Sequence, residues 1–237
     1  MSTVCSLVNV SRRYGRHWAL NSINITLDAS EIIGLVGPNG AGKTSLLRIM
    51  AGLLQPTNGD VRRQGGEPGS ARYFAGERAL PPHVSANTWL RLWAGRRRDD
   101  LGRRRIAALS RGMRQQLGLE ATLSTSPIHR GSSLVLLDEP WEGLDPDATR
   151  WLSAQLIEAR AQGASVMVSS HRIHDLAGVC DRCVFLKRGL VVEEVRMSHS
   201  MAAGIDRSAM LFEAFDRLTA AEPVSTAERS SLNIKSC

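Results

Sequence analysis

The stretch Gly37-Pro38-Asn39-Gly40-Ala41-Gly42-Lys43-Thr44 decides the fold of this chain. Residues 31–36 before it have the pattern of a short buried strand, and residues 45–54 after it have the apolar spacing of a helix. Glycines let backbone N–H groups surround phosphate oxygens without a Cβ in the way, and the helix N-terminus adds partial positive charge. Strand, loop and helix therefore predict a loop that binds a nucleoside triphosphate, with Lys43 on its β and γ phosphates and the Thr44 hydroxyl on magnesium.

A second apolar run, residues 134–137, ends in two carboxylates, Asp138 and Glu139. Such a run is typical of a parallel strand that is buried on both faces and whose carboxyl end opens on the ligand site. We expect Asp138 in the magnesium shell and Glu139 as the base that activates water. Pro140 and residues 143–146 predict a turn, followed by a helix that begins near Asp147.

Two more segments bring polar groups to the ends of elements. Leu109-Ser110-Arg111-Gly112-Met113 places a serine and a glycine at the start of a helix, where a hydroxyl and N–H groups can meet a phosphate. The apolar segment 164–168 ends in Ser169-Ser170-His171, which predicts an imidazole at the end of a strand.

With these segments in this order, residues 4–192 resemble the ATP-binding subunits of ABC transporters. In that family residues 37–44 match the Walker A loop, residues 134–138 match Walker B with Glu139 as the catalytic carboxylate, and residues 109–113 match the signature motif. Residues 143–145 match the D-loop, His171 matches the switch histidine, and Tyr14 matches the aromatic residue that stacks on adenine.

The resemblance implies an ATPase that uses ATP and Mg²⁺. Its catalytic residues are expected to be Lys43, Glu139 and His171. Its nucleotide-binding residues are expected to be Tyr14, Asn39, Gly40, Gly42, Lys43, Thr44, Ser45, Ser110 and Gly112. Its metal ligands are expected to be Thr44, Asp138 and Glu77.

Three positions depart from the family pattern: Glu77, Arg111 and Met113, the last of which stands where glutamine is common. The family glutamine that links magnesium to the membrane partner is expected after residues 71–75, where this chain has Gly76-Glu77-Arg78. Glu77 either takes that role or is a surface acid paired with Arg78. Arg111 stands where the signature usually has glycine, and it either reaches a partner's phosphate or, as we favour, points to solvent.

The resemblance also implies a head-to-tail dimer with a second copy or a similar ATPase subunit. ATP would lie between Walker A of one copy and the signature of the other, so that Ser110 and the N–H groups at Gly112 contact the γ-phosphate held by the partner's Lys43. Because phosphoryl transfer needs mainly positioning and charge neutralisation, we expect this homodimer to hydrolyse ATP.

Composition fits one ATPase domain of 237 residues, of which 43% are hydrophobic and 22% charged. No apolar run approaches the roughly 18 residues that span a bilayer. We therefore expect a cytoplasmic protein, peripheral on the inner face of the cell membrane, whose permease is another chain. Cys180 and Cys183 have metal-ligand spacing, but without a second pair we favour buried reduced thiols.

The formal net charge of +7 is densest at residues 96–98 and 103–105. These arginines lie in the lobe that resembles the membrane-docking part of the family, where they would favour an anionic membrane surface. A solvated arginine-rich face is the alternative. We do not expect nucleic acid as a partner, because aromatics make up only 5% of the chain and do not alternate with the arginines. In the same lobe Trp89, Leu92 and Trp93 share one helical face, which favours core packing over a docking patch.

The predicted fold is a three-layer α/β P-loop ATPase core with an antiparallel β portion near the N-terminus, which holds Tyr14. A shortened helical subdomain is expected at about residues 78–127. Residues 1–220 would form this single domain, residues 208–218 an amphipathic helix, and residues 221–237 a flexible tail. The expected function is the ATP-hydrolysing subunit of a membrane exporter that powers a separate integral membrane permease. The rival is a soluble ABC ATPase that acts as an assembly or scaffold factor.

Overall fold

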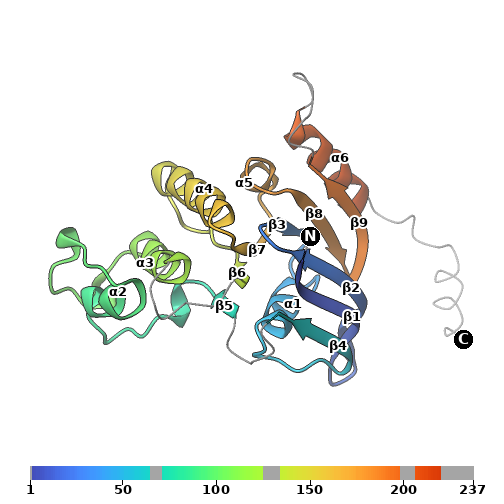
Figure 1. Ribbon diagram of the computed structural model, residues 1–237, viewed down its shortest axis with the longest axis horizontal. Coiled ribbons are helices and arrows are strands. Elements are labelled where there is room, and N and C mark those ends of the chain that lie inside the picture. The colour runs from blue at the N-terminus through green and yellow to red at the C-terminus, as the bar shows by residue number, and fades with distance from the viewer. Residues whose placement is uncertain (1, 65–70, 125–133, 198–205, 220–237) are drawn as a thin grey trace, which may run out of the picture.

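The computed structural model describes residues 2–64, 71–124, 134–197 and 206–219 (Figure 1). The predicted flexible tail at 221–237 lies outside these residues. Residues 124–133, which precede the second apolar run and are rich in Ser, Thr, Pro and Gly, also lie outside them, except for Ser124.

An antiparallel sheet forms the N-terminal part of the molecule. In the described residues it comprises β1 (Thr3–Tyr14), β2 (His17–Asp28) and β4 (Asn58–Arg63), in the order β2-β1-β4. A tight turn joins β1 to β2, because Tyr14 pairs with His17 and Gly15 takes a φ of +57°. The turn places Tyr14 at the end of the hairpin, and the predicted antiparallel portion is confirmed.

A second sheet crosses the middle of the molecule, and its described strands follow the order β5-β6-β7-β3-β8-β9. Neighbouring strands from β5 to β8 are parallel, whereas β9 pairs antiparallel with β8. Because β6, β7 and β3 are adjacent, their carboxyl ends meet at one edge of the sheet. The strands are β3 (Ile32–Val36), β5 (Ala71–Phe74), β6 (Leu134–Asp138), β7 (Ser165–Ser170), β8 (Arg182–Lys187) and β9 (Leu190–Arg196).

Two apolar cores hold three layers together. One core lies between the antiparallel sheet, α1 (Lys43–Met50) and one face of the mixed sheet. The other lies between the opposite face and α4 (Pro146–Ala161), α5 (Ile173–Ala177) and α6 (Arg207–Thr219). Buried strands such as β3 and β7 are apolar on both faces because each face meets a core. The three-layer α/β prediction is confirmed.

A helical lobe lies beside the β5 end of the mixed sheet (Figure 1). It contains α2 (Ala86–Ala94), α3 (Arg111–Leu123) and three short 3₁₀ turns, Glu77–Ala79, Asp99–Leu101 and Ile106–Ala108. Its own core includes Leu90, Ile106 and Leu117. The buried residues of α2 are Ala86, Asn87 and Leu90, whereas Leu92 is 56% exposed. The expected core-facing side of α2 is therefore wrong at Leu92.

Candidate functional site

The phosphate loop is shaped by a glycine whose backbone conformation and surroundings favour the absence of a side chain. Gly42 has a φ of +110° at the N-cap of α1, and a Cβ there would lie 2.4 Å from the carbonyl oxygen of Ala19. Lys43 follows as a buried residue whose Nζ donates to the carbonyl oxygen of Gly37 at 2.7 Å. The loop therefore holds its lysine folded back along the backbone, at the N-terminus of α1.

Asp138 ends β6 among three hydroxyl groups. Its Oδ2 accepts from Thr44 Oγ1 at 2.7 Å, and its Oδ1 accepts from Ser169 Oγ at 2.7 Å. The Tyr73 hydroxyl donates to Oδ2 at 3.5 Å. Burial, followed by the charge of Asp138, raises the pKa of Tyr73, so Tyr73 keeps the proton that it donates. These bonds join the phosphate loop to the end of β6.

Glu139 lies between a cation and an imidazole. Its Oε1 is 3.5 Å from Lys43 Nζ, and its Oε2 is 2.9 Å from His171 Nδ1. The backbone of Glu139 has a φ of +47°, and its N–H donates to Ser169 Oγ at 3.0 Å. The left-handed conformation turns the side chain away from the strand direction, toward the loop and His171.

Thr44 and Asp138 offer oxygen atoms, which are the ligands that Mg²⁺ prefers. No group of three or more His, Cys, Asp or Glu residues forms a metal cluster among the residues that the structure describes.

Tyr14 reaches the phosphate-loop helix from the antiparallel sheet. Its hydroxyl lies 3.3 Å from Ser45 Oγ, its side chain is 44% exposed, and the Arg12 guanidinium lies 4.7 Å from the ring centre. An exposed ring at this edge of the loop can stack on a base. Asn39 and Gly40 lie exposed on the same loop.

The predicted signature residues lie on a different element. Ser110 caps α3, its Oγ accepting from Met113 N at 3.2 Å, and a Cβ at Gly112 would lie 2.9 Å from the carbonyl oxygen of Gly143. Within the described residues, the contacts of Ser110 and Gly112 include none with residues 37–45. The helix N-terminus nevertheless presents N–H groups suited to an anion.

Glu77 lies against two arginines of α3, Arg114 and Arg111. Its Oε2 accepts from Arg114 Nε at 2.9 Å, while Thr44 and Asp138 bond to each other. The carboxylate is only 9% exposed, so Glu77 is not a surface acid, and its contact with Arg78 Nε is long, at 3.8 Å. Because two arginines of α3 attract the carboxylate, these contacts do not bring Glu77 to the magnesium ligands.

Arg111 is exposed, as the favoured expectation has it. Its Nη2 pairs with Glu142 Oε1 at 2.5 Å, and the two side chains are 51% and 52% exposed. The guanidinium therefore lies at the surface beside Glu142. Its pKa is raised by the hydrogen bond to Glu142.

Comparison with known proteins decides the family. A family model described as ABC transporter matches residues 20–142, just over half of the chain. The chain belongs to the ABC transporter family. It is an ATP-binding and ATP-hydrolysing cassette of that family, as expected.

Curated relatives of this ABC cassette carry transport names. The lantibiotic transport ATP-binding protein SrtF of Streptococcus pyogenes is 28% identical over 206 residues, covering 78% of this chain and 88% of SrtF. The ABC transporter ATP-binding protein YxlF of Bacillus subtilis is 30% identical over 209 residues, covering 78% and 68%. The Nod factor export ATP-binding protein I of Rhizobium leguminosarum bv. viciae is 29% identical, covering 80% and 68%.

Solved ABC cassettes share the fold. An ATP-binding subunit of an ABC transporter has a TM-score of 0.70 at 22% identity, covering 92% of this chain and 95% of that chain. The dimeric cassette MJ0796 in a post-hydrolysis state with ADP and Pi has a TM-score of 0.71 at 19% identity, covering 82% and 99%. In the described part of this cassette, no helix has the length and apolar character needed to cross a membrane.

Three polar residues of the cassette had no assigned role in the sequence. Ser169 and Tyr73 bond to Asp138, and Gln115 Nε2 donates to the carbonyl oxygen of Pro140 at 2.8 Å. Ser169 stands in the Ser-Ser-His segment next to the expected imidazole, which was the available signal. Tyr73 and Gln115 have no such signal, because their positions depend on how β5 and α3 pack against β6.

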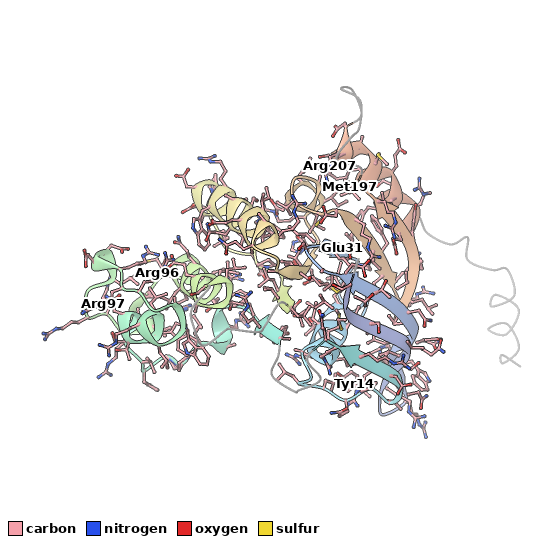
Figure 2. All side chains as sticks on the ribbon, viewed as in Figure 1. Tyr14, Glu31, Arg96, Arg97, Met197 and Arg207 are labelled. Carbon is pink, nitrogen blue, oxygen red and sulfur yellow. The ribbon has the colours of Figure 1, made fainter. Side chains whose placement is uncertain are left out.

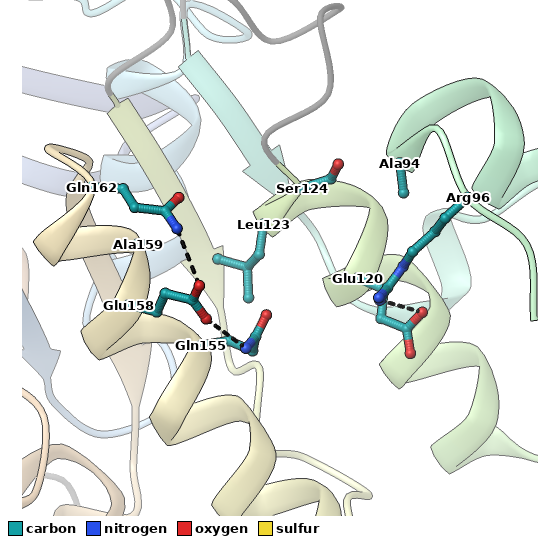
Figure 3. A pocket seen from close by; sticks show the side chains of 9 residues that line it. All are labelled: Ala94, Arg96, Glu120, Leu123, Ser124, Gln155, Glu158, Ala159 and Gln162. Atoms are coloured by element: carbon teal, nitrogen blue, oxygen red, sulfur yellow. Dashed lines mark hydrogen bonds and ion pairs between the residues drawn. The ribbon is translucent and has the colours of Figure 1, made fainter.

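Two arginines of the cluster at residues 96–98 form ion pairs within the helical lobe of this cassette. Arg96 and Arg98 both pair with the buried Glu120, at 2.9 and 2.7 Å. Figure 3 shows Arg96 and Glu120 at a cavity of about 210 Å³ between α3 and α4, lined by Ala94, Arg96, Glu120, Leu123, Ser124, Gln155, Glu158, Ala159 and Gln162. The cavity has no phosphate-loop residue in its lining. Arg97 extends away from the lobe (Figure 2), and Arg96 and residues 103–105 are exposed as well, whereas Arg98 is half-buried.

The cysteine thiols of the described residues, Cys5, Cys180 and Cys183, are buried and free. Cys180 and Cys183 are both inaccessible to solvent, and burial raises the pKa of Cys180 well above its ordinary value. Gly34 makes room for both, because a Cβ there would lie 2.7 Å from Cys183 Sγ. These thiols are core side chains of the second sheet.

Proposed function

We propose that this ABC cassette is the ATP-hydrolysing subunit of a membrane exporter and that it works as a head-to-tail pair with Mg²⁺. The observation that carries the proposal is the junction of Lys43, Thr44, Asp138, Glu139 and His171 at the ends of β3, β6 and β7. The proposal that the transporter is an exporter rests on relatives named for lantibiotic transport and Nod factor export.

Residues at the junction have distinct tasks in this proposal. Lys43, freed from the carbonyl oxygen of Gly37, neutralises charge on the β and γ phosphates. Glu139 orients or deprotonates the attacking water, and His171, hydrogen-bonded to Glu139, senses the γ-phosphate. Thr44 and Asp138 would hold magnesium, which would supply positive charge to the phosphate oxygens. Tyr14 stacks on the base and Ser45 lines the loop.

A partner copy completes the site. Ser110 and Gly112 lie at the N-terminus of α3, and within the described chain their contacts include none with its own phosphate loop. Backbone N–H groups at a helix N-terminus bind phosphate. The γ-phosphate held by one copy would therefore meet the signature of the other, and ATP would join the two.

A separate permease and a position on the inner face of the cell membrane belong to the same proposal. The outward arginines, such as Arg97, support contact with an anionic leaflet, at about 1 kcal/mol for each residue near the surface.

The test is an affinity pull-down from detergent-solubilised membranes of the source cell, comparing wild type with Glu139→Gln. We expect a polytopic membrane protein at near one-to-one stoichiometry, enriched by ATP with the variant. Recovery of soluble partners alone would contradict the exporter and favour the scaffold function.

A further inference from the structure

Glu77 joins the end of the central sheet to the signature helix. It lies just after β5, and its Oε2 accepts from Arg114 Nε at 2.9 Å. Arg114 is one turn into α3, and its Nη1 also donates to the carbonyl oxygen of Leu109 at 2.8 Å. One guanidinium therefore connects the Glu77 carboxylate with the residue that precedes Ser110.

The backbone of Glu77 is held by the next residue of α3. Its N–H donates to Gln115 Oε1 at 3.1 Å. The Nε2 of the same Gln115 side chain donates to the carbonyl oxygens of Pro140 at 2.8 Å and Glu139 at 3.3 Å. Gln115 is buried, so these bonds are shielded from water. Glu77, the first turn of α3 and the residues after β6 thus form one connected unit.

A second ion pair of α3 is of a different kind. Arg111 pairs with Glu142 at 2.5 Å, but both side chains are about half exposed. An exposed pair is screened by water and contributes little, whereas the Glu77 carboxylate is only 9% exposed and its loss leaves the Arg114 guanidinium without its charged partner. Glu77, rather than Glu142, is the carboxylate that fixes the start of α3.

We propose that Glu77 is a positioning residue for the signature helix and acts on the partner copy's nucleotide. Through Arg114 it fixes the direction in which α3 presents Ser110 and Gly112, while its backbone is tied through Gln115 to Glu139, a residue of its own site. Movement at the carboxyl end of β6 is thereby passed to the site across the interface. This inference rests on the head-to-tail pair proposed above.

Mixed pairs of two inactive variants separate action across the interface from action within one chain. Lys43→Ala disables its own phosphate loop but keeps an intact signature, and Ser110→Arg does the reverse. A mixed pair has one live site, with the signature from the Lys43→Ala chain and the phosphate loop from the Ser110→Arg chain. Random pairing should restore about a quarter of wild-type turnover, because about half of the pairs are mixed and each has one live site of two.

Glu77→Ala is then placed on either chain of the mixed pair. We expect recovered turnover to be about tenfold lower with the substitution on the signature donor than on the phosphate-loop donor, since one lost charge-assisted hydrogen bond accounts for such a factor. Equal effects, or a larger effect on the phosphate-loop donor as a magnesium ligand would give, would overturn the proposal. Absence of turnover in the unsubstituted mixture would instead overturn the head-to-tail pair, and this inference with it.

Two further variants exclude misfolding as the cause. Glu77→Ala with Arg114→Ala on the signature donor removes both charges and leaves no buried charge unpaired, so the melting temperature should stay near that of wild type. Turnover should stay as low as with Glu77→Ala alone, because the connection is still absent. Recovery of turnover in the double variant would contradict positioning. Arg78→Gln is the matched control, since Arg78 lies 3.8 Å from Glu77 but its side chain is 92% exposed, and it should leave turnover unchanged.

Discussion

At the scale of single residues, one carboxylate links the groups expected to act on the γ-phosphate. Glu139 contacts Lys43 on one oxygen and His171 on the other, and its backbone N–H is held by Ser169. Its position therefore depends on β3, β6 and β7 together. Changes to Glu139 and to Ser169 should affect catalysis while leaving the sheet intact.

Glu139→Gln should lower ATP turnover by about a hundredfold to ten-thousandfold, the usual range for loss of a general base. ATP binding should persist, because the phosphate loop and Thr44 are unchanged. Steady-state phosphate release and nucleotide binding measured on the same preparation check this. Glu158→Gln, on the exposed side of α4, is the control and should keep wild-type turnover. Unchanged turnover in Glu139→Gln would remove Glu139 from the mechanism.

Ser169→Ala should lower turnover by about tenfold, because the hydroxyl bonds both the Asp138 carboxylate and the Glu139 N–H and a charge-assisted bond is stronger than a neutral one. Ser165→Ala is a matched control at the other end of β7, where the hydroxyl accepts from Ser30 N. The steady-state ATP turnover of the two variants tests this prediction. Equal losses of turnover in the two variants would show that the Ser169 hydroxyl acts through the stability of β7 rather than through its bonds at the site.

The sequence predicts those residues of the site that stand at the end of an apolar strand or just after it. Lys43, Asp138, Glu139 and His171 follow apolar runs, and parallel strands bring their ends together. The direction of the Glu77 side chain depends instead on the packing of α3 beside β5. Arg111 and Arg114, one turn apart on α3, attract the carboxylate, and no local sequence pattern predicts that contact.

At the scale of elements, the turn into α1 depends on one backbone conformation. Gly42 has a φ of +110°, and its missing Cβ leaves room for the carbonyl oxygen of Ala19. Elements that begin at such turns were predicted to within a few residues: α1 begins at Lys43 rather than Ser45, and α4 begins at Pro146 rather than Asp147. The side of α2 that faces the core was predicted less well, because the lobe packs on Ala86 and Leu90.

Gly42→Ala should destabilise the cassette by about 1–3 kcal/mol through backbone strain and weaken ATP binding, since the Cβ would collide with the Ala19 carbonyl oxygen. Urea unfolding and ATP titration measure the two effects. Gly178→Ala is the control, because its φ is −77° and a Cβ there meets nothing within 4 Å. A Gly42→Ala protein as stable and as tightly ATP-binding as wild type would refute the loop geometry.

At the scale of the whole molecule, the proposed head-to-tail pair makes the phosphate loop and the signature helix parts of two half-sites. The loop lies at the carboxyl edge of the mixed sheet, and α3 belongs to the lobe beside β5 (Figure 1). The layered core could be predicted from sequence, since apolar runs and helix patterns alternate along the chain. The internal pairing of Arg96 and Arg98 could not, because Glu120 is distant from them in sequence.

The measurement that tests the composite site most directly is the mass of Glu139→Gln in solution, by light scattering with and without ATP. The chain alone is 25.9 kDa. We predict twice that mass with ATP and Mg²⁺, the monomer mass without ATP, and the monomer mass with ATP when Ser110→Arg is added. A Glu139→Gln protein that binds ATP and still stays at 25.9 kDa would contradict the account.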